Sequence, residues 1–224
     1  MKLNFKIRAS SCGAIMTNDR SGKGMGKTVY SYLDTWMKEQ IYNRKKIIES
    51  KYFDKGIEVE SKSIDYISEQ LKLGMIFKNE EYFENDYMTG CPDLVLPDEI
   101  IEVKNSFDCF TFPLFECEPP NKDNEWQVLV YMALTGRKKA RIIYTLMDTP
   151  SDIVERQMNW AEESEHERIV RYHEYSNLDA KLRIKSFDVD YDQAKIDAIT
   201  DRVIQCRDYI NETMHKLNFT KETT

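Results

Sequence analysis

The sequence predicts an α/β fold (mixed α+β) with a small central mixed sheet flanked by helices. Short, largely apolar runs that are typical of strands occur at 93–96, 99–104, 141–147 and 185–189. Longer stretches that repeat apolar residues at helical spacing lie at 30–50, 55–73, 125–135 and 192–217. No Pro-, Gly- or Ser-rich linker interrupts the 224 residues, so we expect one domain over 1–224.

Charge is unevenly divided along the chain. Residues 1–50 carry ten Lys and Arg against four Asp and Glu, although the net charge of the whole chain is −7. Because salt screens the electric field of each charge beyond about 10 Å, a basic segment can bind a phosphate backbone even on an acidic protein. The alternative is that these cations form a solvated helix face.

A glycine-rich loop at 18–28 lies within this basic segment. Its residues 21–28 (SGKGMGKT) nearly match a phosphate-binding P-loop, but Ser21 replaces the first glycine and residues 12–17 make a poor strand. Such a loop also suits nucleic acid, because its amides can approach phosphates while Arg20, Lys23 and Lys27 supply charge. A P-loop NTPase remains the alternative.

The stretch 55–73 is predicted to be an amphipathic helix. Its apolar residues recur at spacings of seven, three and four: Ile57, Ile64, Ile67 and Leu71. Glu60 falls on the same side of this helix, whereas Glu58 lies about 200° away. A carboxylate that faces the core needs a partner, and a metal ion is an adequate one. The alternative is a glutamate that turns to solvent or pairs with a lysine.

A hairpin is predicted around a two-residue turn at Pro97-Asp98. Antiparallel counting from that turn places Asp93 directly opposite Glu102. Direct partners on one face have Cβ atoms about 5 Å apart, so the two carboxylates repel each other. A divalent cation reverses this effect, because both side chains become ligands of a hard ion.

Lys104 is expected on the same face as Glu102, because Ile101 and Val103 point to the other face. An ammonium beside two metal-bound carboxylates can orient or deprotonate a water molecule and hold a phosphate. The alternative is an exposed hairpin whose outer face happens to be charged.

The remaining chain adds two supporting features. Gln127 and Tyr131 are four residues apart and therefore share one face of the helix at 125–135, which Gly136 is expected to end. The stretch 151–181 is helical in pattern but sparsely apolar.

Cysteine and histidine usage indicate a reduced, cytoplasmic protein. The five cysteines form no CxxC pair, and their odd number argues against a disulfide framework, so we expect free, mostly buried thiols. The three histidines have no ligand spacing and are expected at the surface. No apolar run approaches the roughly 20 residues that cross a bilayer, and the N-terminus lacks a secretory apolar stretch.

Together these residues resemble the PD-(D/E)XK nuclease superfamily, whose core is restriction-endonuclease-like. The elements that match are Gly56-x-x-x-Glu60, Pro92-Asp93, Glu102-Val103-Lys104 and Gln127-x-x-x-Tyr131. Within that superfamily the chain is most similar to the lambda-exonuclease (YqaJ-type) phage recombination nucleases. That similarity rests on Ile7–Ser10, the basic Arg20–Lys23 loop, Gln127-Val128 and the terminal strand-plus-helix. The stretch 151–181 departs from the pattern, and we interpret it as a helical insertion.

The resemblance implies roles for individual residues. Asp93, Glu102 and the Val103 carbonyl would bind magnesium, for which manganese can substitute, and Lys104 would activate water. Glu60 would help to position metal or water, and Gln127, beside Tyr131, would support the site. Ser10 matches a serine that contacts a 5′-phosphate. The family's phosphate-binding arginine falls at Leu3 here, so Arg8 is the substitute that we consider. Four-cysteine iron–sulfur ligation is not expected, since only Cys206 lies late in the chain.

The implied activity is a magnesium-dependent 5′-to-3′ exonuclease that degrades one strand of linear duplex DNA for recombination. The implied setting is the cytoplasm of a bacterial host, with a phage-encoded chain that forms a homo-oligomeric ring such as a trimer. Its partners would be DNA ends and a phage single-strand annealing protein. The rival hypotheses are a structure-specific or restriction-type endonuclease on the same core, and a DNA-binding module without turnover.

Overall fold

The computed structural model describes residues 3–47 and 51–217, apart from the side chains of residues 51–54 and Ile57. The predicted inward position of Ile57 therefore lies outside the described residues. Four strands form the main sheet in the order β4-β5-β6-β7: β4 (Leu94–Val95), β5 (Glu99–Asn105), β6 (Lys139–Thr145) and β7 (Ile184–Asp190). Strands β5 and β6 are parallel and the other pairs are antiparallel, which confirms the predicted mixed sheet.

Two helices cover the opposite faces of this sheet. Helix α3 (Lys51–Leu71) packs Ile64 and Ile67 against Ile101 and Val103 of β5. Helix α4 (Lys122–Thr135) lies on the other face, where its Asn124 donates to the Tyr144 hydroxyl of β6 at 2.6 Å. Alternation along β5 therefore points Ile101 and Val103 toward α3, and Glu102 and Lys104 toward α4.

A second sheet was not predicted. It joins three strands in the order β1-β3-β2: β1 (Ile7–Arg8), β3 (Met88–Gly90) and β2 (Phe83–Glu84). Strands of two or three residues are too short to show a hydrophobic period, so this sheet adds to the predicted central one.

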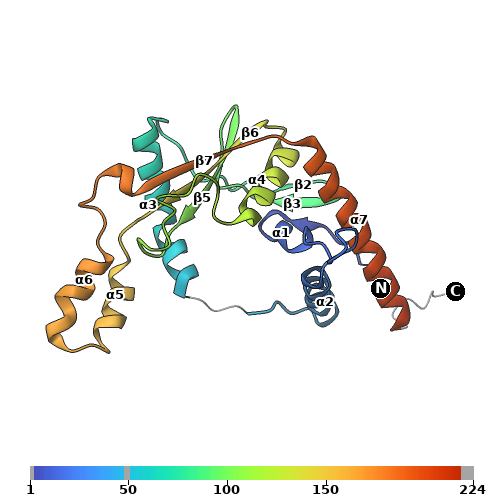
Figure 1. Ribbon diagram of the computed structural model, residues 1–224, viewed down its shortest axis with the longest axis horizontal. Helices are drawn as coiled ribbons and strands as arrows, with labels where there is room; N and C mark the ends of the chain where they lie inside the picture. Colours follow the sequence, from blue (N-terminus) through green and yellow to red (C-terminus); the bar gives the residue numbers. More distant parts are fainter. Residues whose placement is uncertain (1–2, 48–50, 218–224) are drawn as a thin grey trace.

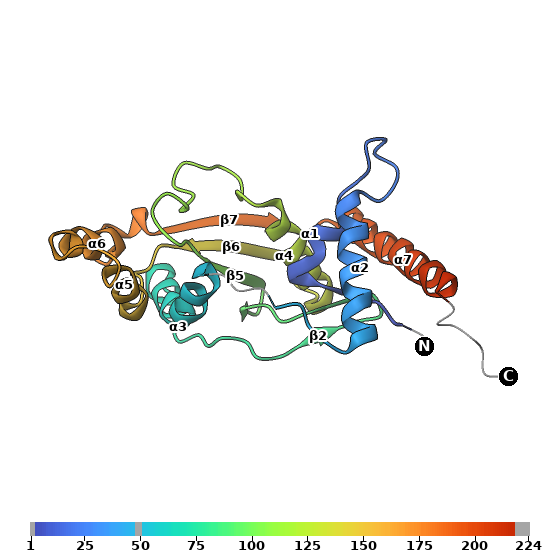
Figure 2. The same ribbon diagram turned by 90° about the horizontal axis from the view of Figure 1, so that it is seen from below.

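The remaining helices lie at the two ends of the molecule (Figures 1 and 2). Helices α1 (Cys12–Ile15), α2 (Lys27–Tyr42) and α7 (Gln193–Lys216) gather at one end, and α5 (Ser151–Met158) and α6 (His166–His173) form a pair at the other. The stretch 151–181 is thus two short helices and two 3-10 turns between β6 and β7. Helix α2 ends at Tyr42 with Asn43 left-handed, so the expected helix over 30–50 was too long.

The structure tests the predictions for Gly136, the thiols and the histidines. Gly136 ends α4 with φ of +77°, as predicted. All five thiols are free, but only Cys12 and Cys206 are buried, so the expectation of mostly buried thiols was wrong. His173 is buried and not on the surface, because Thr149 and Gln157 satisfy its two ring nitrogens at 3.0 and 2.8 Å. Among the described residues, no helix is long and apolar enough to cross a membrane.

Candidate active site

The hairpin of β4 and β5 has the predicted register. Leu94 pairs with Ile101, and the Leu96 amide donates to the Glu99 carbonyl at 2.9 Å across the Pro97-Asp98 turn. The paired residues of the ladder end at Leu94 and Ile101. Asp93 and Glu102 are the next residues on the two strands, directly beyond this last pair. The Asp93 carboxylate accepts a hydrogen bond from the Val103 amide at 2.7 Å, which fixes Asp93 beside β5.

Glu102 is the most buried acidic residue of the hairpin, with 4% of its surface exposed. Its Oε1 accepts from Lys104 Nζ and from Gln127 Nε2, both at 2.7 Å. Its Oε2 is buried and has no hydrogen-bond partner among the residues that the structure describes. A buried carboxylate oxygen without a donor is costly, and a cation is one group that would satisfy it.

Gln127 and Tyr131 complete a hydrogen-bonded network above the hairpin. Gln127 Oε1 accepts from Lys104 at 3.1 Å, while its Nε2 also donates to the Tyr131 hydroxyl at 2.9 Å. Both residues belong to the α4 face that was predicted from their spacing. Gln127 therefore holds Glu102 and Lys104 in a fixed mutual arrangement.

The electrostatics agree with a repelling pair of carboxylates. Burial and, second, the Glu102 charge together raise the pKa of Asp93 to about 8, against the opposing effects of the Val103 amide and Lys104. Burial also raises the pKa of Tyr131, with Glu102 as the second cause. Tyr131 therefore stays neutral and acts as a hydrogen-bond partner.

The donor set fits a magnesium ion. Within 3–47 and 51–217, no three acidic, histidine or cysteine side chains form a group that could hold a metal. Magnesium, however, is commonly bound through one or two carboxylates and keeps several waters. Asp93 and Glu102 with the predicted Val103 carbonyl match that requirement, and the unpartnered Glu102 Oε2 supplies a free oxygen.

Glu60 lies at the edge of this site. It is partly buried on α3, whereas Glu58 is exposed, as helical phase predicted. Oε2 of Glu60 accepts a hydrogen bond from Lys78 Nζ at 2.6 Å, so Glu60 has the lysine partner that the sequence analysis gave as the alternative. Its charge also contributes to the raised pKa of Asp93, which places the two carboxylates within electrostatic reach of each other.

We expect Glu60→Gln to lower the rate of DNA cleavage by tenfold or more, because the neutral amide changes the charge beside Asp93. The matched control is Glu58→Gln on the solvent side of the same helix, which should leave the rate within about twofold of wild type. Steady-state cleavage of linear duplex DNA with magnesium measures both variants. Equal effects would show that Glu60 has no special role.

Arg8 and Ser10 lie on the exposed surface of β1 and of the 3-10 turn Ala9–Ser11. Ala9 packs beside the site, since a Cβ added at Gly90 would meet both the Tyr131 ring and Ala9 Cβ within 3 Å. Arg8 pairs with Thr89 of β3, four residues before Asp93. Ser10 is therefore carried by a turn that contacts the Tyr131 end of the network.

The glycine-rich loop folds as a small hairpin closed by a bridge between Asn18 and Met25, with Gly22 at φ of +75°. Arg202 of α7 holds its base by donating to the Thr17 carbonyl at 3.2 Å and to the Asn18 side chain. Helix α1 precedes it where a P-loop requires a strand, which argues against the NTPase alternative. The loop projects from the α2 end of the molecule (Figure 2).

Three residues near the site carried no sequence signal. Lys78 and Asn79 lie in the connection after α3, eighteen and nineteen residues after Glu60, a separation with no helical or strand period. Thr89 is buried with a hydroxyl that has no partner. Only the tertiary fold brings Lys78 and Asn79 beside Glu60 and Asp93.

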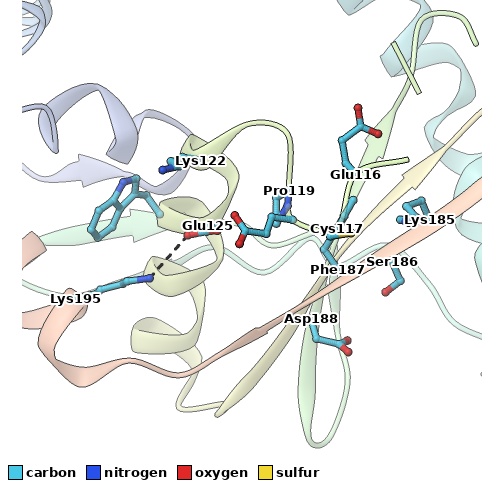
Figure 3. A pocket seen from close by; sticks show the side chains of 12 residues that line it. Glu116, Cys117, Pro119, Lys122, Glu125, Lys185, Ser186, Phe187, Asp188 and Lys195 are labelled. Carbon is cyan, nitrogen blue, oxygen red and sulfur yellow. Dashed lines mark ion pairs between the residues drawn. The ribbon is translucent and has the colours of Figure 1, made fainter. Parts of the chain in front are cut away.

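A separate hollow of about 770 Å³ lies between the start of α4, β7 and the start of α7 (Figure 3). Lys122, Lys185 and Lys195 surround it together with acidic side chains, and Lys195 pairs with Glu125 at 3.8 Å. None of the candidate site residues lines this hollow. Mixed charge of this kind does not favour a single ligand class.

Comparison with known proteins gives a match at the level of structure. No protein-family model and no curated protein matches the chain. A phage-related exonuclease from Haemophilus somnus matches with a TM-score of 0.79 at 22% identity, covering 96% of this chain and 97% of that one. An alkaline exonuclease from Laribacter hongkongensis matches with a TM-score of 0.65 at 16% identity, covering 95% and 94%.

The complex of that alkaline exonuclease with dAMP matches with a TM-score of 0.66 at 15% identity, covering 96% of this chain and 95% of that one. These identities are low, but each alignment spans nearly the whole of both chains. The protein therefore has the fold of these exonucleases, which confirms at the level of fold its resemblance to the lambda-exonuclease type of PD-(D/E)XK nuclease.

Proposed function

We propose that the protein is a magnesium-dependent deoxyribonuclease that degrades one strand of linear duplex DNA from a 5′ end. The observation that carries the proposal is Glu102, which is buried opposite Asp93 with Lys104 on one oxygen and no partner on the other. A stable fold gains nothing from two buried carboxylates that repel each other, unless a cation binds them. The shared fold of the two exonucleases supports the same proposal.

Asp93, Glu102 and the Val103 carbonyl would hold the magnesium ion. When bound, it supplies a Lewis acid that polarises a phosphoryl oxygen and lowers the pKa of a coordinated water. The hydrogen bond from the Val103 amide keeps the Asp93 carboxylate turned toward β5. Gln127 keeps Glu102 in place from the α4 side.

Lys104 would act on the attacking water and on the phosphate. Its ammonium carries three donors, of which two already bind Glu102 and Gln127, at 2.7 and 3.1 Å. The third N–H donor of Lys104 can point to a water molecule or to a phosphoryl oxygen. Because both partners are fixed by the network, the ammonium is positioned before substrate arrives.

End recognition would come from Arg8 and Ser10, which flank Ala9, the residue that lies near the Tyr131 end of the site. We propose that these residues bind a 5′-phosphate, which gives the enzyme its polarity. Linear duplexes labelled at one end, with either a 5′-phosphate or a 5′-hydroxyl, test this directly. We expect faster loss of the 5′-phosphorylated strand, and Ser10→Ala should reduce that preference. Equal rates for the two ends would contradict it.

The glycine-rich hairpin would hold the DNA backbone. Arg20, Lys23 and Lys27 are exposed, and in the described part of the chain none of them has a carboxylate partner. Neutralising all three should weaken DNA binding and flatten its salt dependence by up to about three units of log–log slope. Neutralising Lys62, Lys139 and Lys181 is the control. Specific ATP binding by the wild type would instead revive the NTPase hypothesis.

Assembly into a closed ring around DNA is part of the proposal, with an annealing protein as a further partner. A basic track on an otherwise acidic exterior suits such a ring, because the outside does not compete for the duplex. Heterologous contacts with closed cyclic symmetry would form it. A monomer in sedimentation at micromolar concentration with linear DNA would contradict the ring.

A further inference from the structure

A second lysine, Lys78, lies beside the carboxylates of the candidate site. Its Nζ donates to Glu60 Oε2 at 2.6 Å. The Asp93 charge also acts on it, because the pKa of Lys78 is raised first by the Glu60 hydrogen bond and then by the charges of Glu60 and Asp93. The site therefore has a cation at its Glu60 side as well as Lys104 at its Glu102 side.

The neighbouring residue, Asn79, fixes the position of Lys78. The Asn79 amide donates to the Asp93 carbonyl at 2.7 Å, and its side chain donates to the Pro92 carbonyl at 3.0 Å. A further contact at 3.6 Å joins the Asn79 side chain to Cys91 Sγ. The backbone at 78–79 is thus tied to the Pro92-Asp93 segment that precedes β4, which keeps the Lys78 backbone beside the site.

Lys78 has spare capacity to bind an anion. An ammonium has three donors, and within the described part of the chain only the bond to Glu60 is formed. Its side chain is 49% exposed, compared with 28% for Lys104. Lys78 can therefore contact a ligand from solvent while it stays on Glu60.

The charge balance of the metal-free site favours such a contact. Three carboxylates, those of Glu60, Asp93 and Glu102, face two lysines. A phosphate that approaches an acidic site is repelled unless exposed cations lie on its path. Lys78 is the more exposed of the two.

We propose that Lys78 is a substrate-binding residue whose ammonium contacts a backbone phosphate of the strand being cut, at the Glu60 side of the site, with Asn79 holding it in place. This inference rests on the proposed nuclease function. It assigns Lys78 to binding and leaves the activation of water to Lys104.

The test compares Lys78→Met with Lys78→Arg and with a matched control, Lys62→Met. Lys62 is an exposed lysine two residues after Glu60 and about 200° round the same helix. For Lys78→Met we expect KM for linear duplex DNA to rise about tenfold with kcat changed less than twofold, because a charge-assisted hydrogen bond is lost. The salt dependence of DNA binding should flatten by about one unit of slope. Lys78→Arg should restore both values, and Lys62→Met should match wild type.

Two outcomes would overturn the inference. One is an unchanged KM and salt slope in Lys78→Met. The other is a fall in kcat alone, which would mean that Lys78 acts only by holding Glu60. A wild type that binds DNA but cleaves none would defeat the nuclease function instead, and the salt slope of Lys78→Met would still decide whether the phosphate contact exists.

Discussion

Lys104→Ala is expected to lower DNA hydrolysis by a factor of about 10³ while magnesium and DNA still bind. Lys104 is the cation held on Glu102 and Gln127, and a group that transfers or orients the proton of the attacking water contributes about 10²–10⁴ in rate. The carboxylates that we propose to bind metal are untouched, since Gln127 still donates to Glu102.

Single-turnover cleavage, calorimetric titration with magnesium and anisotropy with labelled duplex measure the three properties separately. Lys185→Ala is the matched control, because register places Lys104, Tyr144 and Lys185 in one row on one face of the sheet. That control should cleave at close to the wild-type rate. Cleavage by Lys104→Ala within tenfold of wild type would remove Lys104 from the mechanism.

Asp93→Asn is expected to abolish magnesium binding and hydrolysis, yet to stabilise the metal-free protein. The amide oxygen can still accept from the Val103 amide, so the local structure is kept. Burial beside Glu102 disfavours the ionised form of Asp93 that the unfolded chain carries, and the variant removes this penalty, which should raise the free energy of unfolding by about 1–3 kcal/mol near neutral pH. For a chain of this length, that corresponds to a rise in Tm of roughly 3–10 °C.

The stability that Asp93→Asn gains over the wild type should increase with pH. The pKa of Asp93 is about 8 in the fold, against an ordinary value of 3.8, so the wild type loses stability as pH rises from about 4 to 8. Asp93→Asn does not titrate, so its advantage in EDTA should be absent near pH 4 and complete above pH 8. Asp98→Asn, in the turn of the same hairpin, is the control. A less stable Asp93→Asn at pH 8 would contradict the repulsion.

The sequence predicted the hairpin because its information is local. The turn at Pro97-Asp98 and the alternation of Ile101 with Glu102 set register and facing, and the structure has both. The face shared by Gln127 and Tyr131 followed from helical spacing in the same way. These features depend on periods of two and 3.6 residues, which are visible in a single sequence.

The features that the sequence missed depend on contacts between distant segments. The second sheet is made of strands too short to carry a period, and Lys78 reaches Glu60 only because Asn79 is tied to Pro92 and Asp93. His173 is buried through partners on α5 and on the segment before it. No local pattern distinguishes these residues from exposed ones.

The most direct test of the nuclease proposal is one incubation series with linear, nicked and covalently closed circular duplexes. Each is incubated with the wild-type protein in magnesium and, separately, in EDTA. We predict that linear duplex loses one strand from its ends in magnesium, that closed circles stay intact, and that EDTA stops the reaction. Cleavage of closed circles at the same rate as linear DNA would show an endonuclease, and cleavage in EDTA would contradict the metal site at Asp93 and Glu102.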